Sequence, residues 1–182
     1  YDAPFSVDQT TLVRAIVVEA GKTQSKIAEG NYRLVSASKK PGVTYAIFQE
    51  ERLNALPDFT NKKPKQSGVT KEFSTEVLDE ISEVANTAVV FTAQLEVLTP
   101  GEYTFYTTSD DGSKLYVDNQ LVVNNDGDHG VQERSGSVSL SKGKHTLKIE
   151  YFNGGGGYYL DAKYKGPGIG KQIIPADKLS QE

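Results

Sequence analysis

Two adjacent carboxylates, Asp110 and Asp111, are the residues of this sequence whose type and spacing point most directly to chemistry. Paired carboxylates at a strand end concentrate the hard oxygen ligands that Ca²⁺ prefers. The next residue is Gly112, and Asp-Gly between two strands is also a strong signal for a hairpin turn. The residues themselves therefore leave two interpretations open, a calcium site and a plain turn.

A second oxygen-rich segment covers residues 124–128. Asn124, Asp126 and Asp128 alternate as the ligands of a calcium loop do, but the twelfth position from Asn124 is Ser135, where a helix–loop–helix site needs a bidentate Glu. Because that motif fails, we expect a solvated turn. The functional alternative is a rim loop in which Asp128 and His129 touch a ligand.

Catalytic motifs are missing from the sequence. There is no His-Glu-x-x-His, nucleophile elbow or phosphate loop, and the absence of Cys excludes a thiol nucleophile and thiolate metal sites. The pair Asp79-Glu80 is interpreted as part of a solvated face. His145 alternates with apolar residues, as a histidine on a sheet face does. We predict no catalytic activity for this chain by itself.

Charge and hydropathy exclude two classes of partner. Lys and Arg number 20 against 24 Asp and Glu, a net charge of −4, whereas nucleic-acid binding needs a basic footprint. Apolar runs such as residues 15–18 and 88–91 are far shorter than a membrane span. We expect no nucleic acid, no membrane insertion and a monomer. The start at Tyr1, without Met or leader, is interpreted as an excised or processed piece.

The elements that must position these residues are short strands. Apolar and polar residues alternate with period two, and turn signals such as residues 100–101, 118–119 and 142–143 separate the runs. Strands are expected near 11–19, 44–50, 91–97, 102–108, 113–118, 121–124, 136–140, 145–151 and 158–164. This pattern predicts an all-β, antiparallel β-sandwich or barrel. Apolar residues with helical spacing predict one short helix over 76–85.

Composition divides the chain near residue 40. Residues 35–41 are small, polar and punctuated by Pro41, as a linker is. Residues 1–34 hold two or three strands, too few for independent stability, so they form a partial β-sandwich module. Residues 42–179 form the β-barrel domain.

Several motifs of the second part together resemble a known family. They are residues 41–48 (PGVTYAIF), 100–105 (PGEYTF), 108–118 (TSDDGSKLYVD) and 142–145 (KGKH) leading into 149–151. On these motifs, residues 41–178 resemble a protective-antigen-type domain of the PA-fourteen family, a β-barrel or sandwich found in glycosidases, adhesins and toxins.

The resemblance implies a ligand set. In sugar-binding members the two Asp are joined by a cis peptide and hold Ca²⁺, which coordinates vicinal sugar hydroxyls. Carried to this sequence, the ligands are the side chains of Asp110, Asp111 and Asn153 and the carbonyls of Gly155 and Gly157. Asp128, His129 and Tyr158 are expected near the sugar. Four glycines, residues 154–157, replace the bulkier and often aromatic loop of the lectins.

Residues 1–33 resemble the second half of a chitobiase or β-hexosaminidase C-terminal-type module. The similar pieces are residues 1–5 (YDAPF), 11–15 (TLVRA), 21–22 (GK) and 25–28 (SKIA). The order of the two modules implies the C-terminal region of a bacterial N-acetyl-β-hexosaminidase that is secreted, periplasmic or cell-surface. The expected function is a non-catalytic carbohydrate-binding accessory domain. The alternatives are a structural module that packs on or spaces the parent catalytic domain, and an adhesin fragment.

Overall fold

The computed structural model describes residues 11–15, 28–32 and 40–181. The chain divides into two units, residues 1–39 and 40–182. In the first unit β1 (Thr11–Ala15) and β2 (Ala28–Tyr32) pair antiparallel, with Thr11 opposite Tyr32. The expected continuation of the first strand to residue 19 and most of the resemblance over residues 1–33 lie outside the described residues.

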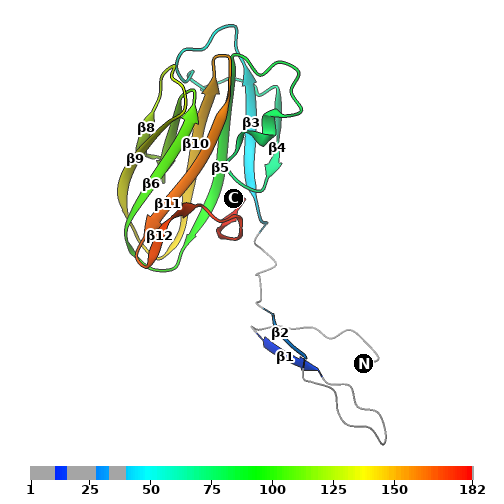
Figure 1. Ribbon diagram of the computed structural model, residues 1–182, viewed down its shortest axis with the longest axis vertical. Coiled ribbons are helices and arrows are strands. Elements are labelled where there is room, and N and C mark those ends of the chain that lie inside the picture. Colours follow the sequence, from blue (N-terminus) through cyan, green and yellow to red (C-terminus); the bar gives the residue numbers. More distant parts are fainter. Residues whose placement is uncertain (1–10, 16–27, 33–39, 182) are drawn as a thin grey trace, which may run out of the picture. The chain divides into compact units, whose positions relative to one another are not determined.

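The second unit consists of two antiparallel sheets (Figure 1). One sheet has the order β4-β3-β5-β10-β7-β8, with β13 also pairing with β5, and the other has the order β12-β11-β6-β9. The expected all-β architecture is therefore confirmed. The strands are β3 (Val43–Gln49), β4 (Gln66–Thr70), β5 (Thr87–Val97), β6 (Gly101–Asp110), β7 (Ser113–Val117), β8 (Gln120–Asn125), β9 (Gln132–Leu140), β10 (Gly143–Asn153), β11 (Tyr159–Gly166), β12 (Ile169–Ile173) and β13 (Leu179–Ser180).

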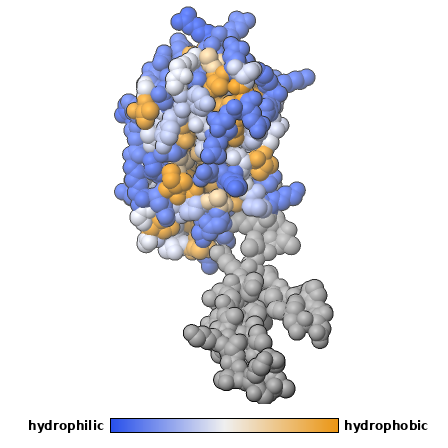
Figure 2. All heavy atoms as spheres, turned by 45° about the vertical axis from the view of Figure 1, so that its right-hand side comes forward, coloured by the Kyte–Doolittle hydropathy of each residue, from blue (hydrophilic) through white to orange (hydrophobic). Residues whose placement is uncertain are grey.

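The core lies between the sheets and follows the alternation of the sequence. Phe91, Ala93 and Leu95 of β5 are buried, and the residues between them are half-buried. Phe105 of β6 belongs to the same cluster and is fully buried. Burying side chains of this size contributes about 1.5–3 kcal/mol each, so the core holds both sheets in place. Figure 2 shows a mainly hydrophilic outer surface with separate hydrophobic residues.

A smaller apolar cluster covers part of the outer face of the seven-stranded sheet. Its buried members are Phe48, Leu53, Ala88 and Phe152. Phe59 packs against it, with its ring 5.1 Å from that of Phe48. The long connection between β3 and β4 is therefore anchored on the sheet, and it brings Leu53 close to the end of β10, where a Cβ on Gly154 would lie 2.6 Å from the Leu53 carbonyl oxygen.

The helix expected over 76–85 is wrong. The structure has only a 3₁₀ turn, η1 (Thr75–Leu78), capped by the Ser74 hydroxyl, which accepts from the Glu76 N–H. Leu78 alone is fully buried there, so the apolar residues that follow reach the core from irregular backbone. Without a capping box, nothing local favoured a longer helix. A second 3₁₀ turn, η2, covers Ala176–Lys178. None of the described helices is long and apolar enough to cross a membrane.

Two hairpins show what the turn signals achieve. β7 and β8 are joined by Asp118-Asn119, whose φ angles of 48° and 66° are those of a type I′ turn. Asp118 also binds the adjacent strand, because its Oδ1 accepts from the Thr146 N–H at 2.8 Å and its Oδ2 lies 2.6 Å from His145 Nδ1. The turn therefore fixes β8 and β10 together.

The His145–Asp118 pair predicts a pH dependence of stability. Burial lowers the pKa of His145, but its bonds with Asp118 and the Ser141 carbonyl outweigh this, and the pKa lies above its ordinary value of 6.5. The contribution is complete below the unfolded value and is lost as pH rises through the folded pKa. We expect the free energy of unfolding to fall between about pH 6 and 8 in wild type, and to fall less in Asp118→Asn. Urea denaturation across this range tests it, and identical pH profiles would refute it. Asn tolerates positive φ and keeps the acceptor for Thr146, so the turn survives the change.

Candidate functional site

Asp110 and Asp111 lie where β6 ends and the chain turns into β7. The peptide bond between them is cis. The Tyr151 hydroxyl, inside the core, donates a hydrogen bond of 2.6 Å to the Asp110 carbonyl oxygen. Strand β10 therefore holds the backbone of the pair from below.

The Asp111 carboxylate joins two loops. It is 4% exposed; Oδ1 accepts from the His129 N–H at 3.2 Å and Oδ2 from the Gly154 N–H at 2.8 Å. Burial raises the pKa of Asp111, the two N–H donors lower it, and the charges of Asp128 and Asp110 raise it further, so the pKa lies above its ordinary value. A cation beside this carboxylate would replace the lost solvation.

Asp110 is half-buried, and its carboxylate accepts no hydrogen bond from any residue that the structure describes. The glycine loop passes it closely: a Cβ placed on Gly157 would lie 3.6 Å from Asp110 Oδ2, and one on Gly154 would lie 3.5 Å from Asp111 Oδ2. Both carboxylates therefore face the backbone of residues 154–157, and both keep lone pairs for a further partner.

Asn153 ends β10 and points its amide toward the same loop. It is 1% exposed, its Nδ2 donates to the Val84 carbonyl at 3.0 Å, and its Oδ1 accepts from the Gly155 N–H at 3.1 Å. These two bonds fix which amide atom faces the loop. The Oδ1 atom has a second lone pair, so Asn153 can still serve as an oxygen ligand.

The donor set fits a hard cation. Among the described residues no group of three or more His, Cys, Asp or Glu could hold a metal ion. A metal at Asp110 and Asp111 would therefore need amide and backbone carbonyl oxygens as well, which Asn153 and the glycine loop offer. Such mixed oxygen sets suit Ca²⁺, whereas zinc sites prefer nitrogen and sulfur.

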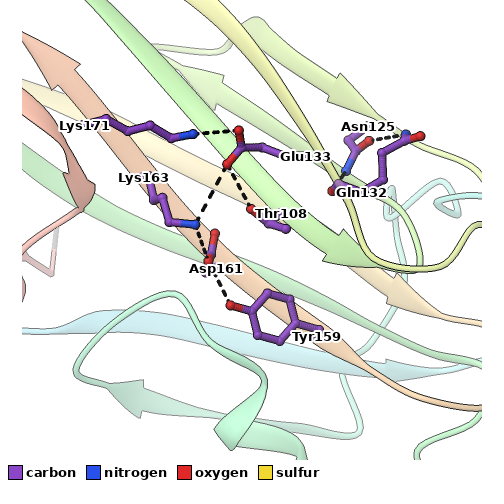
Figure 3. A network of polar contacts seen from close by, with 8 residues as sticks. All are labelled: Thr108, Asn125, Gln132, Glu133, Tyr159, Asp161, Lys163 and Lys171. Carbon is purple, nitrogen blue, oxygen red and sulfur yellow. Dashed lines mark hydrogen bonds and ion pairs between the residues drawn. The ribbon is translucent and has the colours of Figure 1, made fainter.

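The oxygen-rich segment 124–128 serves the fold. Asp126 is already satisfied, because Oδ1 accepts from the Leu56 N–H at 2.8 Å and Oδ2 from Lys114 Nζ at 2.7 Å. Asn125 is buried and bonds with Gln132, whose side chain donates to its Oδ1 at 2.8 Å (Figure 3). The segment is a turn that positions the residues after it.

The rim residues differ in what they offer. Both ring nitrogens of His129 contact backbone carbonyls, of Gly130 at 2.8 Å and Asn125 at 3.0 Å, so its N–H and not its ring reaches Asp111. Burial lowers the pKa of His129, but these carbonyls raise it, and the net shift is upward. Asp128 is exposed, and its charge acts on Asp111.

Exposed aromatic and apolar residues surround the pair. The Tyr158 hydroxyl donates to Asp79 at 3.4 Å, which brings Asp79 to the rim. Sequence reasoning missed Tyr159 and Val131, which are 42% and 65% exposed. Tyr159 pairs with Asp110 across the strands and donates to Asp161 Oδ2 at 2.9 Å, within the polar network of Figure 3. The alternation of β11 could have placed Tyr159 on this face.

Comparisons with known proteins give the context. Residues of this chain are 29% identical over 80 positions, 43% of the chain, to the anti-sigma-I factor RsgI3 of Acetivibrio thermocellus. An anti-sigma factor domain-containing protein from Clostridium clariflavum is 26% identical with a TM-score of 0.62, over 76% of this chain. The chain spans 12% of the first relative and 46% of the second.

These relatives correct one expectation. Nothing supports the resemblance of residues 1–33 to a chitobiase or β-hexosaminidase module, and the related proteins are anti-sigma factor proteins. Two pieces of that resemblance, residues 1–5 and 21–22, lie wholly outside the described residues. Short motifs around single strands carried too little information to identify a parent enzyme.

The fold and the family agree with the resemblance of the second part. The PA14 sugar-binding domain from an RTX adhesin is 17% identical with a TM-score of 0.65, covering 79% of this chain and 99% of that one, and shows the same fold. The PA14 domain profile matches residues 39–178, most of the chain. The chain belongs to the PA14 domain family.

Proposed function

We propose that the second unit is a non-catalytic carbohydrate-binding module whose site consists of Asp110, Asp111, Asn153 and the backbone of the glycine loop, with Ca²⁺. One observation carries this proposal. Two neighbouring carboxylates face a loop of four glycines, and the carboxylate of Asp110 has no hydrogen-bond partner among the described residues. Two negative charges in such proximity are best compensated by a cation.

The residues of the chain perform separate tasks in this site. Asp111 fixes both loops through the N–H groups of His129 and Gly154, and it still presents lone pairs. Asn153 and the carbonyls of Gly155 and Gly157 would complete the oxygen set. When bound, Ca²⁺ supplies a positive charge that can accept the lone pairs of vicinal sugar hydroxyls. Tyr158, Tyr159 and Val131 would then contact the hydrocarbon face of the sugar.

Two comparisons support a sugar as the ligand and a regulatory parent. The structurally similar adhesin domain is described as sugar-binding, and the two relatives nearest in sequence are described as anti-sigma factor proteins. We infer that this module is the glycan-binding part of a parent protein of the anti-sigma factor kind, and that it lies outside the cytoplasm, where polysaccharides occur.

A structural role is the second candidate, and one observation favours it. Asp111 already has two N–H partners and thereby joins the loops at residues 126–131 and 153–158 without a metal. In that case the pair would only shape this end of the domain. The two candidates differ in whether Asp110, which joins nothing, is needed for binding.

A glycan array distinguishes the two. We expect wild-type protein to bind at least one class of glycan in 1 mM Ca²⁺ and to lose at least about 90% of the signal in chelator, because the ion is part of the ligand contact. Asp110→Ala should behave as wild type in chelator. Glu102→Ala, which removes an exposed carboxylate from the same strand, is the matched control and should bind normally. Binding that survives in Asp110→Ala would count against the proposed site.

A further inference from the structure

A hollow of about 460 Å³ lies on the outer face of the seven-stranded sheet, apart from the Asp110–Asp111 pair. Its wall is the connection between β3 and β4, with Pro57 and Phe59, and its floor is the paired strands β7 and β10. None of the residues proposed to hold Ca²⁺ is among its lining residues. The hollow is therefore a distinct feature of the fold.

Four polar side chains form the floor as a two-by-two array. In the register of β7 and β10, Lys114 stands opposite Glu150 and Tyr116 opposite Lys148. The residues between them in each strand are fully buried in the main core, so these four point to the outer face. A sheet face with two cations, a carboxylate and a phenol offers donors and acceptors in fixed positions.

Glu150 is the centre of the array. It is only 9% exposed although it lines an open hollow; Oε1 accepts from Lys148 Nζ at 2.7 Å and Oε2 from the Tyr116 hydroxyl at 3.1 Å. Burial and the nearby Glu150 charge raise the pKa of Tyr116 to about 12, so its hydroxyl stays protonated and donates. The carboxylate therefore keeps its orientation, with lone pairs left for a ligand.

The charges of the floor are compensated inside it. Lys148 pairs with Glu150 and also lies 4.2 Å from the centre of the Tyr116 ring, and Lys114 pairs with Asp126 at 2.7 Å. A charged ligand would have to compete with these pairs. A neutral ligand with several hydroxyls can add bonds to them without breaking any.

The wall is apolar and held in place. Phe59 packs on Phe48, and the backbone of Leu56 donates to Asp126 Oδ1 at 2.8 Å. The hollow therefore exists before any ligand arrives, with one apolar side and one polar side, as pre-formed small-molecule sites have. A carbohydrate has this same pair of faces, a hydrocarbon face and an edge of hydroxyls.

We propose that this hollow is a second carbohydrate site that works without calcium. The ligand lies with its hydrocarbon face against Pro57 and Phe59, and its hydroxyls bond with Glu150, Lys148 and Lys114. The inference is independent of the calcium site, because it uses none of that site's residues.

The test is an NMR titration of the ¹⁵N-labelled full chain in excess chelator. The probes are the neutral trisaccharides cellotriose, xylotriose and maltotriose. We expect at least one probe to shift the backbone amides of Thr60, Lys114 and Glu150 saturably. Glu150→Gln should weaken that binding about 10-fold or more, because it removes a charged hydrogen-bond partner. Glu133→Gln, an ion-paired carboxylate on the other sheet, is the matched control and should bind as wild type.

Each other outcome overturns the second site. It is wrong if none of the three probes shifts these amides, or if shifts occur only with Ca²⁺ and only around Asp110. It is also wrong if Glu150→Gln, with unchanged amide positions elsewhere in the spectrum, binds as tightly as wild type. Tyr116→Phe supplies a second variant, which keeps the ring and removes the hydroxyl that orients Glu150. Failure here leaves the calcium-dependent array result untouched, so the two proposals are tested separately.

Discussion

Millimolar Ca²⁺ is expected to raise the melting temperature of the metal-stripped protein by about 5–10 °C. The reason is mass action: a ligand that binds only the folded state at about 100 times its Kd stabilises it by about 2.7 kcal/mol. Asp110→Ala should abolish the rise, since Asp110 presents its carboxylate to the site and accepts no hydrogen bond there from described residues. Differential scanning calorimetry with and without Ca²⁺ measures both.

The variant also has an informative baseline. Asp110→Ala removes one of two neighbouring negative charges, so in chelator its melting temperature should equal or exceed that of wild type. Mg²⁺ is the matched ion, because it demands near-ideal octahedral geometry and keeps several of its waters, and should give a smaller rise. No rise with Ca²⁺ would make the structural role of the pair the better account.

Gly112→Ala is expected to destabilise the protein by about 1–3 kcal/mol and to weaken the calcium response. A Cβ at this position would lie 2.6 Å from the Phe152 ring and 2.7 Å from the Gly127 backbone nitrogen. Relief of that overlap must move residues 127–129 away, and with them the N–H of His129 that binds Asp111. Urea denaturation and the same calcium scan measure the two effects.

Gly130→Ala is the control for this variant. Gly130 lies in the same loop, but a Cβ there would meet nothing within 4 Å, so its effect should stay within about 0.5 kcal/mol. Equal destabilisation by the two variants would mean that loop entropy and not packing decides the result. A Gly112→Ala protein as stable and as responsive as wild type would refute the packing argument.

The glycine after the Asp pair also shows where the turn hypothesis needed the structure. Asp111-Gly112 looks like a two-residue hairpin turn, yet Gly112 is not among the residues with positive φ. Its side chain is missing because Phe152 and Gly127 approach so closely. Asp118-Asn119, by contrast, has the positive φ angles that its sequence predicts. Local signals find local turns, but they cannot reveal a packing demand from distant segments.

The strands follow the same division. Long alternating runs such as β5 and β10 were predictable because each has a buried face of period two. The edge strand β4 reads Gln-Ser-Gly-Val-Thr and is mostly exposed, and β13 is two residues long, so neither has a pattern to detect. The spacing over 76–85 predicted a helix, but only Leu78 needed to be buried. Tertiary contact decided these elements.

For the candidate site, the family resemblance named residues that the structure does bring together, namely Asp110, Asp111, Asn153 and the glycine loop. The contribution of His129 through its backbone N–H was not predictable, because any residue can donate there. Glu150 was equally hidden: its partners come from β7 and from its own strand, and the apolar wall comes from the β3–β4 connection.

A crystal structure of the protein grown in millimolar Ca²⁺ tests the central claim most directly. The account predicts one ion about 2.3–2.6 Å from carboxylate oxygens of both Asp110 and Asp111, from Asn153 Oδ1 and from the carbonyl oxygens of Gly155 and Gly157. An ion bound elsewhere, or an Asp110–Asp111 pair that contacts only water and protein at that concentration, would contradict it.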